Sequence, residues 1–120
     1  MSKTPISKPY NLEERTYEFA KSVSIFCKSL PKTIENIEYV KQVIRSSGSV
    51  GANYIEANES LGKKDFMMRI RICIKEAKES GYWLRLLKDN NDGSSKEFDN
   101  LIGESNELRK IFAAILNKSV

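Results

Sequence analysis

Positively charged side chains are the residues whose spacing most clearly indicates a chemistry in this chain. The chain has 120 residues and a formal net charge of +4. Between Lys63 and Asp89 there are eight basic and four acidic residues, and the rest of the chain is balanced at twelve of each. A cluster of cations on one segment is typical of a protein that binds an anionic partner such as nucleic acid. The candidate contacts are Arg69, Arg71, Lys75, Lys78 and Arg85.

The same segment also has a simpler interpretation. Asp65, Glu76 and Glu79 lie among the cations, and Lys75 with Glu79 has the i, i+4 spacing of an ion pair on an exposed helix. A solvated helical face and an anion-binding face therefore both remain open. They differ in one respect, because each phosphate that a binding face neutralises adds affinity that falls as the salt concentration rises.

Catalytic and metal-binding chemistry find little support in the composition. The chain contains no histidine, so it lacks the commonest general base and the commonest zinc ligand. A ferritin-like di-iron centre needs Glu-x-x-His pairs and is therefore excluded. Residues 57–64 depart from the phosphate-binding loop G-x-x-x-x-G-K-[ST] at the first and last positions, and they join two predicted helices. We expect a non-enzymatic protein that needs no metal or other cofactor.

The cysteines and the overall composition indicate one globular domain of the cytoplasm. Cys27 and Cys73 lie among apolar residues without a Cys-x-x-Cys motif, so we predict two buried, reduced thiols. Apolar residues make up 40% and charged residues 30% of the chain, which are ordinary globular values. No apolar run approaches the roughly 18 residues of a membrane span, and the N-terminus lacks the apolar block of a signal peptide.

The first helix is predicted to follow a flexible arm at residues 1–10, which carry two prolines and no periodicity. Asn11 and Glu14 have the spacing of a capping box, and Pro31 stops the helix near Leu30. The inward stripe recurs every three or four residues, as in a bundle helix. It consists of Leu12, Thr16, Phe19, Val23, Phe26 and Leu30.

The second helix is predicted to begin near Thr33 to Glu35 and to run to about Leu61. Small residues crowd its middle at 46–51, where two glycines would each cost about 1 kcal/mol relative to alanine. A continuous helix is favoured because the stripe continues through this stretch, and close approach of a neighbouring helix would offset the glycines. A linker between two short helices is the alternative. The predicted inward stripe is Ile37, Val40, Ile44, Ser47, Gly51 and Tyr54, with Val43, Val50 and Ala57 alongside it.

Two polar residues of the second helix lie one turn apart. Asn53 and Glu56 could form a polar hook for a ligand, or they could be hydrogen-bonded groups that fix the register of the helices. In the structural interpretation, which we favour, Glu56 pairs with a base of the third helix such as Arg69 or Arg71.

The third helix is predicted to start after Gly62, which would cap the end of the second helix, with Asp65 as its own N-terminal cap. Its inward stripe is Phe66, Ile70, Ile74, Ala77, Gly81 and Leu84. A second, partial stripe consists of Met68, Ile72, Trp83 and Leu86. This second stripe indicates either a contact with a neighbouring subunit or a wider core face.

The last helix is predicted to follow a polar loop at residues 89–94. Ser94 and Glu97 have the spacing of a capping box. The inward stripe is Phe98, Leu101, Ser105, Leu108, Phe112 and Ile115. Four helices with short connections predict an all-α, antiparallel up-down-up-down four-helix bundle over residues 11–120.

Two stretches of the sequence resemble a known family. Residues 45–57 read Arg-Ser-x-x-Ser-Val-Gly-Ala-Asn-x-x-Glu-Ala, and residues 64–87 contain Lys-x-Phe, Ile-Lys-Glu-Ala-Lys-Glu and Tyr-Trp-Leu-x-x-Leu. These motifs resemble the bacterial four-helix bundle family associated with 23S ribosomal RNA intervening sequences. The motif residues on the second helix are Ser49, Gly51, Asn53 and Glu56, and those on the third helix are Phe66, Glu76, Tyr82, Trp83 and Leu84.

The resemblance implies a small non-enzymatic bundle, often a homopentamer with a central channel. The chain is also similar to the accessory protein of diversity-generating retroelements, whose basic surface engages nucleic acid and a reverse transcriptase. The resemblance carries no catalytic residues. Two hypotheses follow: a self-assembling protein that binds structured RNA or DNA through the third helix, or a protein-interaction module that uses Tyr82 and Trp83 and has no nucleic-acid role.

Overall fold

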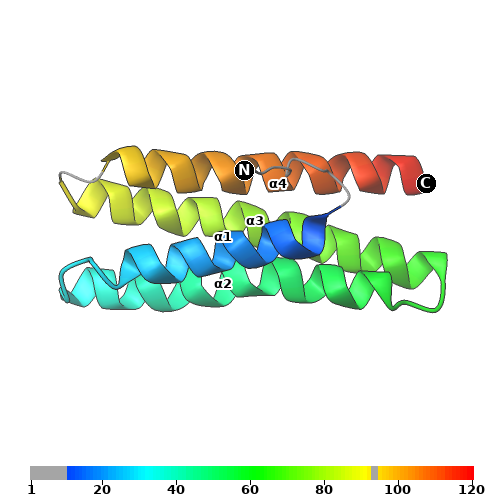
Figure 1. Ribbon diagram of the computed structural model, residues 1–120, viewed down its shortest axis with the longest axis horizontal. Helices are drawn as coiled ribbons and strands as arrows, with labels where there is room; N and C mark the ends of the chain where they lie inside the picture. The colour runs from blue at the N-terminus through cyan, green and yellow to red at the C-terminus, as the bar shows by residue number, and fades with distance from the viewer. Residues whose placement is uncertain (1–10, 93–94) are drawn as a thin grey trace.

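The computed structural model describes residues 11–92 and 95–120, and these residues form four helices without a strand. The helices are α1 (Leu12–Cys27), α2 (Ile34–Asn58), α3 (Lys63–Asn90) and α4 (Ser95–Ser119). They pack side by side, and the chain runs in opposite directions in successive helices, which is compatible with an up-down-up-down bundle (Figure 1). The predicted all-α fold of four helices is confirmed. The predicted arm at 1–10 and the predicted cap at Ser94 lie outside the described residues.

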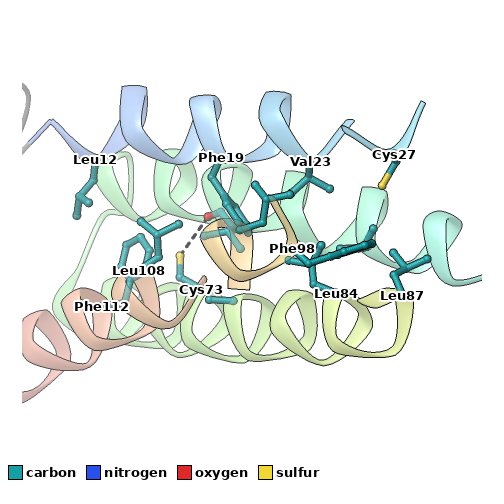
Figure 2. Close-up of a cluster of buried hydrophobic side chains, with 14 of the residues drawn as sticks. Leu12, Phe19, Val23, Cys27, Cys73, Leu84, Leu87, Phe98, Leu108 and Phe112 are labelled. Atoms are coloured by element: carbon teal, nitrogen blue, oxygen red, sulfur yellow. Dashed lines mark hydrogen bonds between the residues drawn. The ribbon is translucent and has the colours of Figure 1, made fainter. Parts of the chain in front are cut away.

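One apolar core runs along the bundle, and all four helices contribute to it (Figure 2). Val23, Val43, Ile70 and Leu84 have no exposed surface, which matches the three- and four-residue spacing of their helices. The ring of Phe26 meets that of Phe98 edge to face, with centroids 4.7 Å apart. This core is what holds the polar residues of α2 and α3 in place.

The join between α1 and α2 differs from the prediction in two details. Helix α1 ends at Cys27 rather than at Leu30, because the backbone tightens so that Leu30 N–H donates to the carbonyl of Cys27 at 3.2 Å. Leu30 nevertheless stays in the core. The side chain of Asn11 makes no capping hydrogen bond, so the predicted capping box is wrong. Thr33 does cap α2, since its Oγ1 accepts from the backbone N–H of Asn36 at 3.1 Å.

The predicted roles of Gly62 and Asp65 are wrong. Helix α2 ends at Asn58, and the carbonyl of Ala57 accepts from both the backbone N–H and the hydroxyl of Ser60. Gly62 is instead the N-terminal cap residue of α3, with the extended dihedral angles φ −158° and ψ 167°. Asp65 lies in the first turn of α3, where its negative charge interacts favourably with the positive end of the helix dipole.

Helix α2 is continuous through residues 46–51, so the alternative of a linker is wrong. Gly51 explains how the glycines are tolerated, because a Cβ atom there would lie only 2.8 Å from Oγ1 of Thr16 on α1. The predicted close approach of a neighbouring helix is therefore confirmed at Gly51. A Cβ atom at Gly48 would meet nothing within 4 Å, so that glycine has no such role.

The inward face of α2 is rotated from the predicted stripe. Ile37 and Ile44 were expected in the core, yet each is 41% exposed. The buried positions include Asn36 and Ser46, which the apolar pattern passed over. The two polar residues can be buried because each has a partner on α3: Asn36 exchanges hydrogen bonds with Asn91, and the hydroxyl of Ser46 lies 2.9 Å from that of Ser80.

Both cysteines are free thiols in the interior, as predicted. Burial raises the pKa of Cys27 to about 11 and that of Cys73 to about 12. The Cys73 thiol also donates to the carbonyl of Val50, with 3.4 Å between Sγ and the oxygen. Within the part of the chain that the structure describes, no helix has the length and apolar character needed to cross a membrane.

Candidate nucleic-acid interface

Four of the five predicted cations lie on one exposed side of α3. Together with Tyr82 they recur at intervals of four, three, four and three residues, which places them on one face of a helix. We call this set the basic face. It consists of Arg71, Lys75, Lys78, Tyr82 and Arg85, all exposed.

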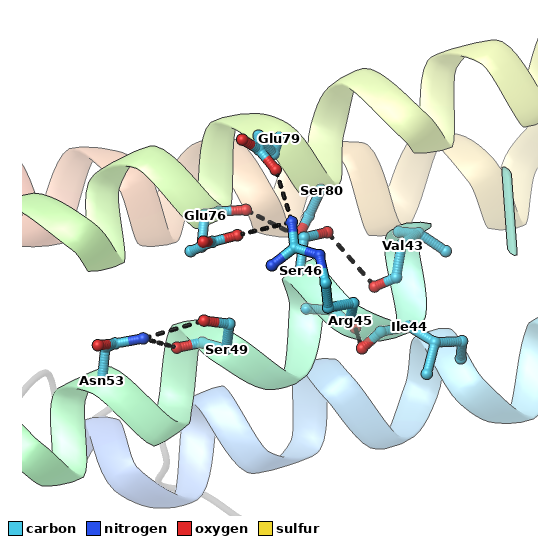
Figure 3. A network of polar contacts seen from close by, with 10 residues as sticks. Val43, Ile44, Arg45, Ser46, Ser49, Asn53, Glu76, Glu79 and Ser80 are labelled. Atoms are coloured by element: carbon cyan, nitrogen blue, oxygen red, sulfur yellow. Dashed lines mark hydrogen bonds and ion pairs between the residues drawn. The ribbon is translucent and has the colours of Figure 1, made fainter. Parts of the chain in front are cut away.

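The acidic residues that interleave with these cations in the sequence turn toward α2: Glu76 is buried, and Glu79, one turn after Lys75 at the edge of the basic face, is half-buried. Glu76 and Glu79 both turn toward Arg45 of α2, whose Nη2 lies 3.3 Å from one carboxylate and 2.8 Å from the other (Figure 3). Glu76 is only 6% exposed. The ion pair of Glu79 is thus made with Arg45 and not with Lys75 at i−4, so Lys75 makes no ion pair with any of the described residues.

Arg69 is separate from the other four cations. It is half-buried and donates from Nη1 to Oδ1 of Asn53 on α2 at 3.1 Å. Asn53 in turn donates from Nδ2 to the carbonyl and the hydroxyl of Ser49, both at 2.9 Å (Figure 3). Asn53 is therefore a hydrogen-bonded group between helices, as the structural interpretation predicted. Glu56 is exposed and, among the described residues, makes no ion pair, so its predicted pairing with a base of α3 is wrong.

The remaining motif residues of α3 mainly build the core. Leu84 is fully buried, and Phe66 and Trp83 are half-buried against the core. The ring of Trp83 packs against that of Tyr39 on α2, with centroids 5.9 Å apart. Trp83 thus widens the core face, which was one of the two alternatives for the second stripe, whereas Met68 stays 44% exposed.

A shallow groove of about 360 Å³ continues the basic face onto α4. We call it the basic groove. Its lining is Lys78, Gly81, Tyr82 and Arg85 from α3 with Ile102, Asn106 and Arg109 from α4. Asn106 and Arg109 are not among the predicted contacts, because their positions relative to α3 depend on how the two helices align, and helix periodicity does not give that alignment.

The cations of the groove differ from other cations of the bundle. Lys88 is paired with Asp99 at 2.7 Å, and Arg15 with Glu104 at 2.7 Å. The hydrogen bonds that Arg15 donates to the carboxylate of Glu104 also raise the pKa of the Arg15 guanidinium. None of the ion pairs formed within residues 11–92 and 95–120 involves a cation of the basic groove. Their charge is directed to solvent.

Among the described residues, no three Cys, Asp or Glu side chains lie together in a way that could hold a metal ion. The segment that resembled a phosphate-binding loop joins α2 to α3 and follows a helix rather than a strand. The cations that line the basic groove favour binding of an anion.

The fold and this face define a small four-helix bundle with a basic outer side. The chain belongs to the 23S rRNA-intervening sequence protein family, which matches residues 10–114 and confirms the resemblance seen in the motifs of α2 and α3. It is similar to the crystal structure of a protein with unknown function from the S23 ribosomal protein family of Bacteroides thetaiotaomicron. The two chains are 28% identical with a TM-score of 0.76, over 87% of this chain and 96% of that one. A comparison with curated proteins gives no match.

Proposed function

We propose that this protein is a non-enzymatic, self-assembling up-down-up-down bundle that binds structured RNA or DNA through the basic face of α3. One observation carries the proposal. The exposed positions of α3 from 71 to 85 hold four cations and no acid, while Glu76 and Glu79 share the single guanidinium of Arg45 on the side toward α2. Such a surface attracts a phosphate backbone by charge. The free, buried cysteines fit a reducing compartment, so we place the protein in the cytoplasm.

The proposed binding should depend strongly on salt. If the four cations of the basic face each neutralise one phosphate of a duplex, the slope of log affinity against log salt concentration is roughly −3 to −4 for one chain. Several copies in one assembly would present several such faces and add their contacts.

The test is the affinity of the protein for a structured RNA hairpin across a salt series. Replacing Lys75 and Lys78 by Gln should weaken binding and reduce the slope by about 2. The control replaces Lys21 and Lys32, two exposed lysines outside α3, and thereby makes the same change in net charge. Equal losses in the two double variants, or no association of the parent at low salt, would contradict the proposal.

Self-assembly is supported by the outward side of α2. Ile37, Ile44 and Ile55 are exposed there, and a Cβ atom at Gly48 would meet only open space, so a helix of a second copy could approach closely. Light scattering of the parent should give the mass of an oligomer, with a homopentamer as the number that the resemblance implies. Ile44→Glu should lower that mass, whereas Ile25→Glu on the exposed side of α1 should not. A monomeric parent at micromolar concentration would reject assembly.

The second candidate is a protein-interaction module, such as a reverse-transcriptase accessory, that does not bind nucleic acid itself. The same exposed isoleucines of α2 favour it, because an apolar helix face can equally contact another protein. Charge reversal at Lys75 and Lys78 separates the two functions. Loss of RNA binding with the assembly intact supports the first function, and capture of a protein partner by a parent that binds no RNA supports the second.

A further inference from the structure

An exposed aromatic ring lies among the cations of the basic groove. Tyr82 is 54% exposed, and Lys78 and Arg85 lie one turn before and one turn after it on α3. Asn106 and Arg109 lie across the groove on α4. A charged face that only attracts phosphates has no need of an aromatic ring at its centre, whereas a surface that binds bases does.

The ring of Tyr82 is held in position by its neighbour. Its centroid lies 5.0 Å from that of Trp83, and the two planes are 79° apart, an edge-to-face contact. Trp83 is itself fixed against Tyr39 of α2. A ring that already packs against a neighbour loses less conformational entropy when a ligand stacks on it than a ring without such a contact.

The chemistry of the groove suits a strand with unpaired bases better than a duplex. In a duplex the bases are already stacked and paired, so an aromatic side chain at the backbone gains little from them. In a single strand, a loop or a bulge, a base can stack on the ring while the flanking phosphates meet cations on both sides. Asn106 adds an amide that can both donate to and accept from the edge of a base.

We infer that the basic groove between α3 and α4 binds an unpaired stretch of the nucleic acid strand, with Tyr82 as the stacking platform for one base. Lys78, Arg85 and Arg109 then contact the phosphates next to that base. This inference rests on the proposed function, and it specifies which part of a structured RNA or DNA this side of the bundle holds.

The experiment compares a single-stranded oligonucleotide with a blunt duplex of equal total charge, by fluorescence anisotropy at one salt concentration. The parent should bind the single strand more tightly. Tyr82→Ala should weaken single-strand binding by about 5- to 150-fold, the range of one base–aromatic stack, and leave duplex binding within about twofold. Tyr82→Phe should keep the parent affinity. Tyr17→Ala is the matched control, because Tyr17 is an equally exposed tyrosine on α1, 59% exposed.

The outcomes separate this inference from the proposed function. Tyr82→Ala with unchanged single-strand affinity, with equal losses for both ligands, or with a changed oligomer mass would overturn the stacking role. The proposed function would still stand in these cases if duplex binding kept its negative salt slope. No binding of either ligand by the parent would reject both. Thermal unfolding that matches the parent confirms that the Tyr82 variants are folded.

Discussion

Gly51 of α2 and Thr16 of α1 are so close that a Cβ atom at Gly51 would lie 2.8 Å from Oγ1 of Thr16 and 3.1 Å from its Cβ. The threonine is buried, and its hydroxyl donates to the carbonyl of Leu12 at 2.7 Å, so it is held in this position by its own helix. Helices α1 and α2 therefore meet where α2 has no side chain. Gly81 of α3 has a similar relationship with Ser105 of α4, at 2.9 Å.

Substitutions at Gly51 should destabilise the bundle through overpacking. Gly51→Leu should lower the free energy of unfolding by roughly 1–3 kcal/mol or more. Gly51→Ala combines the same kind of clash with a gain of about 1 kcal/mol in helix propensity, so it should be less stable than Gly48→Ala by about 1–3 kcal/mol. Urea unfolding at one protein concentration measures both.

Gly48→Ala is the control for this prediction, because its new Cβ atom meets nothing and only the gain in propensity remains. In the Gly51→Ala background, Thr16→Ala should recover part of the loss, since it removes the hydroxyl at the closest approach. If Gly51→Leu melts like the parent, the close contact between α1 and α2 is refuted.

The sequence was sufficient to predict four helices, the start of the second near Thr33 and the close approach at Gly51, because each depends on local propensity or on the spacing of one helix. It was not sufficient to predict which side of α2 is buried. Ile37 is more apolar than Asn36, and a pattern of hydrophobicity alone turns it inward. The amide of Asn36 is buried because Asn91 lies beside it, and that partner is 55 residues away in the chain.

For the candidate site as well, the sequence predicts what the spacing of one helix determines, but not how two helices align. Helix periodicity applied to the charges separates Arg69 from the other four candidate cations, and this step needs only the sequence. The pairing of Glu76 and Glu79 with Arg45, and the position of Arg109 in the groove, require the alignment of one helix against another. That alignment results from the packing of the core, which no single helix encodes.

Arg45 should stabilise the bundle mainly through Glu76. Arg45→Met removes the cation next to a carboxylate whose side chain is 8% exposed, and should lower the free energy of unfolding by about 1 kcal/mol. The effect is modest because Arg45 itself is 53% exposed and solvent screens it. Urea unfolding at pH 7 gives the value.

Two further variants make the test specific to this pair. Lys41→Met removes a lysine that is paired only with exposed Glu38 on the same helix, so it should change stability by less than about 0.5 kcal/mol. Adding Glu76→Gln to Arg45→Met should restore part of the loss, because the buried group is then neutral. An Arg45→Met variant as stable as Lys41→Met would show that the pair contributes nothing.

The amides of Asn36 and Asn91 should act as one unit that joins the start of α2 to the end of α3. Each donates to the other, at 2.8 and 2.9 Å, and each also donates to a backbone carbonyl. Asn36→Ala should cost about 1–3 kcal/mol, because it leaves buried polar partners without a hydrogen bond. The double variant should be more stable than the sum of the single variants predicts, by about 0.5 kcal/mol or more.

Asn90→Ala is the control for this cycle. The Asn90 amide is exposed and donates only to the carbonyl of Leu86, so its loss should stay within about 0.5 kcal/mol. Additive effects of Asn36→Ala and Asn91→Ala in chemical unfolding would mean that the two amides are not coupled.

The stability of the protein should fall above pH 9, in part because of Cys73. Its pKa is raised from 9.0 to about 12 by burial, so the folded chain holds the thiol proton more tightly than the unfolded chain does. The corresponding stability is fully present below pH 9 and is lost as the pH rises toward 12.

Cys73→Ala lacks this contribution, although it is less stable at pH 7 because it leaves a small cavity. The parent should therefore lose its advantage over Cys73→Ala between pH 9 and 11, when unfolding is measured by urea at each pH. All other ionisable groups are the same in the two proteins, so their contributions cancel in the difference. A difference that stays constant from pH 7 to 11 would mean that the thiol ionises as readily in the folded chain as in the unfolded one.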